Sequence, residues 1–162
     1  MNMKRFSIIS LLLWIGILAF ASGKPKVMWL DCSANFQRFS YPDSIRFYVD
    51  KCHEAGITHL VLDIKDNTGE VLYPSKYAAQ KKNWKNFDRP DFDFINTFIK
   101  AAHAHGMVIF AGMNIFADGQ NIVKRGAVFD KHKKWQAINY VPRKGLLPVT
   151  EIEGKPTMFL NP

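Results

Sequence analysis

The most constraining feature of the sequence is a unit that occurs twice with its parts in the same order. In each copy an amphipathic helical pattern ends at a glycine, Gly56 or Gly106, and a nearly continuous apolar run follows. The first run ends at Asp63 and the second at Asn114. A glycine after a helical pattern is a common helix stop, and an apolar run without alternation indicates a strand buried on both faces. Such strands alternating with helices predict a parallel sheet with right-handed crossovers.

This pattern places three strands and two helices along the chain. We expect strands over 26–31, 59–65 and 107–114, one helix from near Pro42 to Gly56, and another over about 91–105. Residues 77–89 are expected to form a long basic loop, whereas 117–162 carry turn and charge signals without helical periodicity. The class is α/β, as an open doubly wound sheet or as part of an eight-stranded barrel, and spacing alone does not choose between them.

The N-terminus has the organisation of a secretory signal peptide. Lys4 and Arg5 precede sixteen uncharged, mostly apolar residues that end in Ala19-Phe20-Ala21, a small-x-small cleavage pattern. We therefore expect residues 1–21 to be removed on export to the periplasm, cell surface or medium. The run is shorter than the roughly 20 apolar residues that span a bilayer, so no stable membrane span is expected after cleavage.

Composition narrows the class of protein and of partner. A hydrophobic content of 48% in 162 residues excludes a disordered or coiled-coil chain and fits one globular domain. The net charge of +8 would suit nucleic acid, but an exported protein seldom meets it, so no nucleic-acid partner is expected. A basic surface also suits an anionic envelope or polysaccharide.

Polar side chains follow the ends of the three expected strands. Asp31 ends the first strand, Asp63 and Lys65 end the second, and Asn114 ends the third. Ligands of parallel α/β folds gather at the carboxyl ends of strands, so we predict that these four residues bind substrate, with hydroxyl-rich sugars as the fitting class. Asp31 and Asp63 are the one pair available for carboxylate-based glycoside hydrolysis. The alternative is that Asp63 pairs with Lys65 or caps a loop.

Neither a metal nor a cofactor is expected. The segment Asp66–Gly69 fits a turn better than a calcium loop, because the later calcium ligands are missing. The histidines lie on separate elements or faces, and there is no glycine-rich phosphate loop. Cys32 and Cys52 could form a disulfide after export, although the inward helical position of Cys52 favours a buried thiol.

Aromatic residues are frequent in and beside the expected loops. Their rings either stack on the C–H faces of sugars or pack under the loops as satellite clusters. The residues concerned are Phe36, Tyr41, Tyr73, Tyr77, Trp84, Phe87, Phe116 and Trp135.

The segment from Gly56 to Ser75, with Asp63-Ile64-Lys65-Asp66 at its centre, resembles the bacterial family-10-like glycosyl hydrolases, glycosidases of the α-amylase-like barrel group. Trp29-Leu30-Asp31 and Met113-Asn114-Ile115-Phe116 fall where that family has its first and third strands, and the resemblance spans about 26–162. It implies a partial (β/α)8 TIM barrel made of the first three βα units. The implied function is that of a secreted glycoside hydrolase acting on a poly- or oligosaccharide by carboxylate acid/base catalysis.

The family's proposed catalytic carboxylates belong mainly to later strands, so no catalytic residue is assigned here. The chain is expected to be a fragment of a longer protein, inactive by itself. Phe110 and Gly112 stand where the family has a His and a Trp, which motivates a second hypothesis of a non-catalytic carbohydrate-binding or cell-surface interaction protein with a degenerate barrel. A complete small α/β domain of unrelated function is the third.

Overall fold

A central parallel sheet organises the computed structural model, which describes residues 23–126, 133–154 and 157–159. Its strands pair in the order β1-β2-β5, where β1 is Val27–Leu30, β2 is His59–Lys65 and β5 is Val108–Met113. Helix α2 (Pro42–Glu54) connects β1 to β2, and α3 (Phe94–Ala104) precedes β5. These five elements confirm the positions predicted from the sequence to within a few residues. The predicted signal peptide, 1–21, lies outside the described residues.

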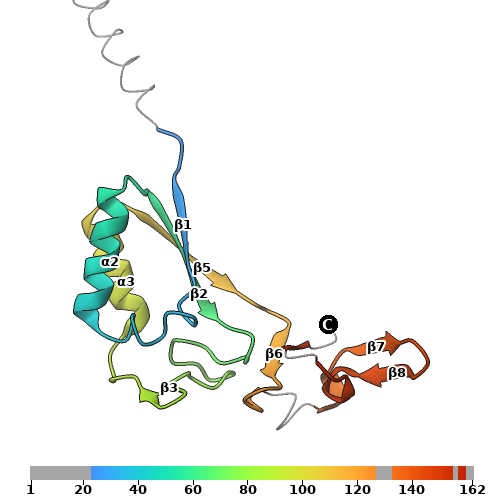
Figure 1. Ribbon diagram of the computed structural model, residues 1–162. Helices are drawn as coiled ribbons and strands as arrows, with labels where there is room; N and C mark the ends of the chain where they lie inside the picture. The colour runs from blue at the N-terminus through green and yellow to red at the C-terminus, as the bar shows by residue number, and fades with distance from the viewer. Residues whose placement is uncertain (1–22, 127–132, 155–156, 160–162) are drawn as a thin grey trace, which may run out of the picture.

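Both helices cover the same face of the sheet, as Figure 1 shows. Leu60, Leu62 and Ile64 of β2 point into this layer and are buried, whereas the side chains between them are half-buried. Helix α2 adds Ile45 and Val49 to the core, and α3 adds a further set, namely Phe94, Phe98, Ala101 and Ala102. Burial therefore alternates along β2, because one face of the sheet is covered by the two helices and the other face is not.

Each helix ends where the sequence predicts a stop. Gly56 has a φ of +76° and Gly106 a φ of +66°, both in the left-handed region that glycine occupies without a Cβ penalty. Helix α3 begins with Asp93 as its N-cap, whose side chain accepts a hydrogen bond from the backbone N–H of Asn96 at 3.0 Å. The predicted start near residue 91 is thus a few residues early.

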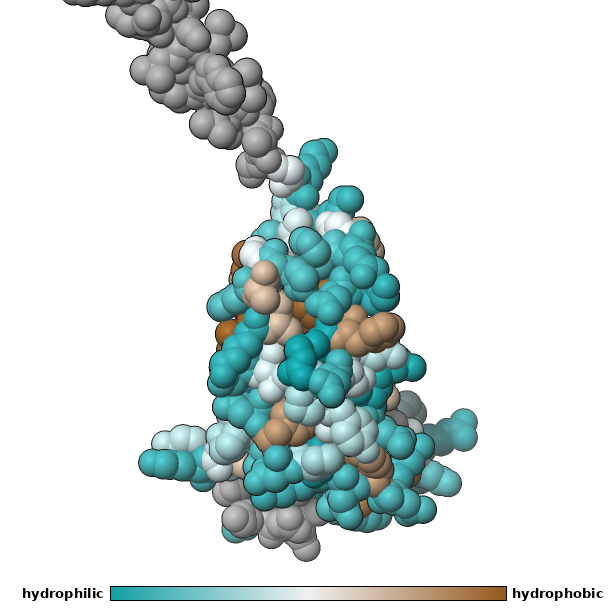
Figure 2. Space-filling view, turned by 90° about the vertical axis from the view of Figure 1, so that its left-hand side faces the viewer, coloured by the Kyte–Doolittle hydropathy of each residue, from teal (hydrophilic) through white to brown (hydrophobic). Residues whose placement is uncertain are grey.

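The outer surface of the helical layer is largely hydrophilic, as Figure 2 shows from that side. The exposed positions of α2 include Arg46, Asp50 and Lys51. An amphipathic helix with one face on the core and a charged opposite face is expected to produce this surface.

The rest of the described chain forms short antiparallel pairs. The pairs are β3 (Asn83–Trp84) with β4 (Phe87–Asp88), β6 (Ala117–Gln120) with β9 (Thr157–Phe159), and β7 (Ile138–Val141) with β8 (Gly145–Pro148); two 3₁₀ turns, η1 (Lys133–Trp135) and η2 (Val149–Glu151), lie among them. The prediction of a long basic loop over 77–89 is therefore incomplete, because this segment contains the β3–β4 hairpin.

The prediction of a partial (β/α)8 barrel over 26–162 is wrong. In the described residues the parallel sheet has three strands, with β1 and β5 at its edges, and the helix needed to complete a third βα unit does not follow β5. The chain enters the short antiparallel strand β6 instead. The fold is a small mixed α/β arrangement. The alternation of apolar strands and helices specifies βαβ units, and an open sheet satisfies it as well as a barrel does.

Neither α2 nor α3, the two α-helices among the described residues, has the length and apolar character needed to cross a membrane.

Candidate functional site

Three of the four predicted site residues line one pocket. Asp31, Asp63 and Asn114 come from the carboxyl ends of β1, β2 and β5 and face a cavity of about 280 Å³. Other lining residues include Asp66, Asn67, Thr68, Lys81, Trp84 and Gln120. We call this cavity the carboxylate pocket. Its position follows from the parallel sheet, because three neighbouring strands end at the same edge.

The Asp31 carboxylate is held in place by the backbone that follows it. Its Oδ1 accepts hydrogen bonds from the backbone N–H groups of Ser33, at 3.0 Å, and Ala34, at 2.8 Å. Oδ1 of this exposed side chain thus closes a local turn, and no described residue donates a hydrogen bond to Oδ2.

Asp63 is the least satisfied carboxylate of the pocket. Burial raises the pKa of its carboxyl above the ordinary value, and the negative charges of Asp31 and Asp66 raise it further. Among the described residues, none donates a hydrogen bond to this carboxylate and none forms an ion pair with it. The alternative that Asp63 pairs with Lys65 is therefore wrong.

Lys65, the fourth predicted site residue, contacts backbone carbonyls. Its ammonium donates to the backbone carbonyls of Asn114 at 2.7 Å, Ile115 at 3.4 Å and Ala117 at 2.6 Å. Burial lowers the pKa of this ammonium, and the carboxylates of Asp118 and Asp66 counteract part of that effect. Because a lysine has three donors, these carbonyls occupy all of them and fix the turn from β5 to β6.

The third strand end is tied to the loop after β2. The side-chain amide of Asn114 donates to Oδ1 of Asn67 at 3.0 Å, and the backbone N–H of Asn114 donates to the carbonyl of Lys65 at 3.3 Å. The backbone carbonyl of Asn67 in turn accepts a hydrogen bond from the backbone N–H of Gly119 at 3.0 Å. The amide of Asn114 thus has a fixed orientation at the pocket wall.

Sequence reasoning missed the ion pair in the wall of the carboxylate pocket. Lys81, only 1% exposed, donates its ammonium to Asp66, which also accepts from the backbone N–H of Thr68 at 2.9 Å. Burial alone would raise the pKa of Asp66, but the hydrogen bonds from Lys81 and Thr68 and the charge of Lys81 bring it below the ordinary value. The ring of Trp84 lies 4.2 Å from the Lys81 ammonium. Nothing in the sequence indicates that Lys81 is buried, because it lies in a basic segment that is expected to be a loop.

Gly112 has no side chain, and an indole from another strand lies over it. A Cβ on Gly112 would lie 3.2 Å from Cζ2 of Trp29 and 3.4 Å from Cγ1 of Val61. The ring of Trp29, on β1, therefore extends over β2 toward β5. Trp29 remains 62% exposed on the sheet face opposite the helices.

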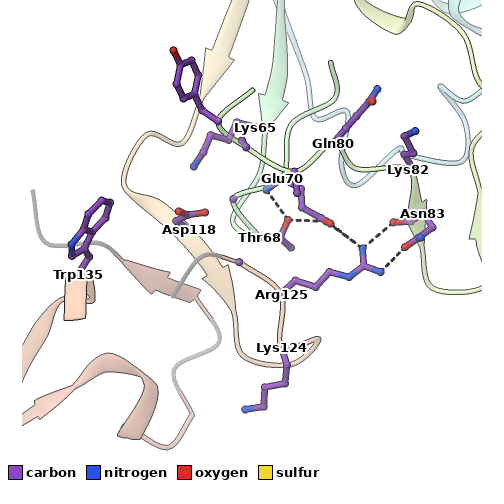
Figure 3. Close-up of a pocket in the computed structure, with 15 residues that line it drawn as sticks. Lys65, Thr68, Glu70, Gln80, Lys82, Asn83, Asp118, Lys124, Arg125 and Trp135 are labelled. Carbon is purple, nitrogen blue, oxygen red and sulfur yellow. Dashed lines mark hydrogen bonds and ion pairs between the residues drawn. The ribbon is translucent and has the colours of Figure 1, made fainter. Parts of the chain in front are cut away.

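A second, larger cavity adjoins the carboxylate pocket. It has a volume of about 700 Å³, within the range of roughly 300–1,000 Å³ that is usual for ligand sites, whereas the volume of the carboxylate pocket is just below that range. Thr68 lines both cavities, and Lys65 lines the larger one. Figure 3 shows the larger pocket, with Trp135 and Asp118 on one side and Arg125 on the other.

The loop aromatics divide into rings that pack against the core and rings that stay exposed. Phe36 is buried in the core, and Tyr73, Trp84 and Phe87 pack partly buried against it. The rings that remain exposed are those of Tyr41, Tyr77, Phe116 and Trp135. Tyr77 and Trp135 line the larger pocket, so only these two of the exposed rings face a cavity described above.

The cysteines form no disulfide with each other. Cys32 is buried and Cys52 half-buried, both as free thiols. Burial, and then the charges of Asp63 and Asp31, raises the pKa of the Cys32 thiol, which keeps it protonated. In the part of the chain that the structure describes, no group of three or more His, Cys, Asp or Glu side chains is arranged to hold a metal.

Comparison with known proteins gives one distant similarity. No protein-family model matches the chain. The chain is similar to an S-layer-related protein. This protein, from Niallia circulans, is 30% identical over 124 residues, which cover 72% of the chain and 8% of the relative. The chain thus spans about 8% of the length of the S-layer-related protein. No solved structure matches this chain. These comparisons do not test the resemblance to the family-10-like glycosyl hydrolases, which stays a prediction.

Proposed function

We propose that the chain belongs to an exported cell-surface protein that binds a glycan in the carboxylate pocket. The observation that carries the proposal is the convergence of Asp31, Asp63 and Asn114 from three strand ends. The predicted signal peptide and the similarity to an S-layer-related protein support the location at the cell surface.

The chemistry of the pocket suits a ligand rich in hydroxyl groups. Asp63 offers both carboxylate oxygens, and Asp31 offers the oxygen that its backbone turn leaves unused. Carboxylates accept hydrogen bonds from hydroxyl donors, and such charge-assisted bonds are stronger than neutral ones. A sugar that binds here supplies Asp63 with the donors that the described residues do not.

The test is the full chain with Asp63→Asn, examined for glycan binding and for stability. We expect binding of oligosaccharides to weaken about tenfold, since an amide replaces a charged acceptor. At pH 7 we expect stability to rise by less than about 1 kcal/mol, because the raised pKa means that the ionised carboxylate destabilises the folded state. This gain disappears as the pH falls below about 4, where the carboxyl is neutral in the folded and unfolded chains.

Calorimetric titration and urea denaturation measure the two effects. Asp88→Asn is the matched control, because Asp88 is exposed and lies outside the pocket. A variant that binds normally but unfolds more easily would show that Asp63 is a structural residue and would overturn the proposal.

Glycoside hydrolysis is a second candidate, favoured by the placement of Asp31 and Asp63 in one pocket together with the raised pKa of Asp63. A general acid with a raised pKa next to an ionised carboxylate is the arrangement that glycosidases use. Asp63 would protonate the leaving oxygen, and Asp31 would act as nucleophile or base. The full chain would then release reducing ends from a polysaccharide, and Asp63→Asn would abolish the release. If the chain bound the polysaccharide but released no reducing ends, hydrolysis would be wrong and glycan binding would remain as the function.

A further inference from the structure

We propose that the larger pocket binds a second unit of the same glycan, and that this unit carries an anionic group, a carboxylate or a phosphate. The inference rests on the proposed function, because it extends the carboxylate pocket into a two-unit site. Three observations support it, namely the shared wall of the two pockets, the polar and aromatic lining of the larger one, and the opposite charges of the two linings.

A single short segment separates the pockets. It runs from Asp66, which lines the carboxylate pocket, to Glu70, which lines the larger one. Thr68, 3% exposed, lies at the centre, and its hydroxyl is within hydrogen-bond distance of both carboxylates, 3.2 Å from Oε2 of Glu70. A wall of one turn allows a ligand to occupy both cavities at once.

The larger pocket has the lining that a sugar ring needs. On one wall the guanidinium of Arg125 contacts Glu70 at 3.2 Å and the backbone carbonyl of Asn83 at 3.1 Å, as the dashed lines of Figure 3 show. The guanidinium, the carboxylate and the carbonyl hold one another in place, so they present hydrogen-bond donors and acceptors in fixed positions. Tyr77, 99% exposed, adds an aromatic ring that no described residue covers. A sugar stacks its C–H face on such a ring while its hydroxyls meet the polar wall.

The charges of the two linings have opposite signs. The charged side chains of the carboxylate pocket are Asp31, Asp63, Asp66 and Lys81, which give an excess of negative charge. Those of the larger pocket are Lys65, Lys82, Lys124, Arg125, Glu70 and Asp118, which give an excess of positive charge. An anionic group is therefore repelled from the first cavity and attracted to the second. The charge difference sets the direction in which an acidic glycan lies across the site.

The test compares three tetrasaccharide-sized probes on the full chain, one neutral, one made of uronic acids and one linked through phosphates. We expect one or both anionic probes to bind about fivefold more tightly than the neutral probe, and the two of them distinguish carboxylate from phosphate. Tyr77→Ala should weaken all three about fivefold without a loss of stability, because the ring is exposed. The double variant Lys82→Gln/Lys124→Gln should remove the preference for anionic probes. Lys100→Gln/Lys144→Gln removes the same charge elsewhere and should leave the preference intact.

The outcomes separate this inference from the function on which it rests. Suppose that the anionic probes bind no better than the neutral one and that neither Tyr77→Ala nor the Lys82/Lys124 double variant changes binding. If Asp63→Asn still weakens binding, the second subsite is wrong and the proposed function stands. If no probe binds the full chain, both are wrong.

Discussion

Replacing Lys81 by methionine is expected to lower the free energy of unfolding by about 3 kcal/mol, because a mostly buried carboxylate then loses its cation. The side chains of Lys81 and Asp66 are 1% and 12% exposed and form an ion pair. Methionine is flexible and apolar, and it can occupy the space near the rings of Trp84 and Phe36, which lie 4.2 and 5.7 Å from the ammonium. The effect therefore reports the lost charge more than a cavity. Urea denaturation followed by tryptophan fluorescence measures it.

Two further variants make this result interpretable. Lys82→Met changes the neighbouring exposed lysine and should alter stability by no more than about 0.5 kcal/mol. Lys81→Met/Asp66→Asn removes both charges and should recover part of the loss, since breaking a buried pair costs more than replacing it. If Lys81→Met were as stable as Lys82→Met, the ion pair would contribute nothing to the fold.

Acid should reveal the same pair in the unmodified chain. The pKa of Asp66 is lower in the folded protein than its ordinary value, so its ionised form stabilises the fold. This contribution is present above about pH 4, near the carboxyl's unfolded pKa, and is lost as the pH falls through the folded pKa. The Lys81→Met variant should lose less stability over the same range.

The sequence predicts the parts of this fold that depend on local pattern. The apolar run over 59–65 becomes β2, and Gly56 and Gly106 end their helices, because a helix stop needs only a left-handed residue at one position. The number of strands in the sheet is not a local property. The barrel prediction failed for that reason, since it needed parallel neighbours for β1 and β5 that the described residues do not supply.

The candidate site divides in the same way. Topology alone brings Asp31, Asp63 and Asn114 together, so a rule about strand ends suffices to find them. The direction of a long side chain depends on what surrounds it, and Lys65 turns to backbone carbonyls that pattern cannot locate. Lys81 lies in a basic, polar segment that is typical of an exposed loop, yet the Asp66 carboxylate and the rings of Phe36 and the nearby Trp84 enclose it.

Gly126→Ala is expected to destabilise the chain by about 3 kcal/mol and to remove glycan binding, because the added methyl group meets three backbone atoms at less than 3 Å. Gly126 has a φ of +115°, and a Cβ there would lie 2.4 Å from Cα of Gly119, 2.5 Å from the carbonyl oxygen of Asp118 and 2.7 Å from that of Thr68. No side-chain rotation relieves these contacts. Residue 126 and its neighbours must therefore shift, and these neighbours are β6 and the segment Asp66–Glu70, which forms the wall of both pockets.

Gly145→Ala separates the steric clash from the backbone strain. Gly145 also has a left-handed φ, +84°, but a Cβ there would meet nothing within 4 Å. Its replacement should cost only the strain of that conformation, about 1 kcal/mol, and leave glycan binding unchanged. The excess loss in Gly126→Ala then measures how tightly the backbone at residue 126 is held against β6 and the pocket wall. Equal losses in the two variants would mean that the backbone around Gly126 relaxes at little cost, and that the close approach does not maintain the site.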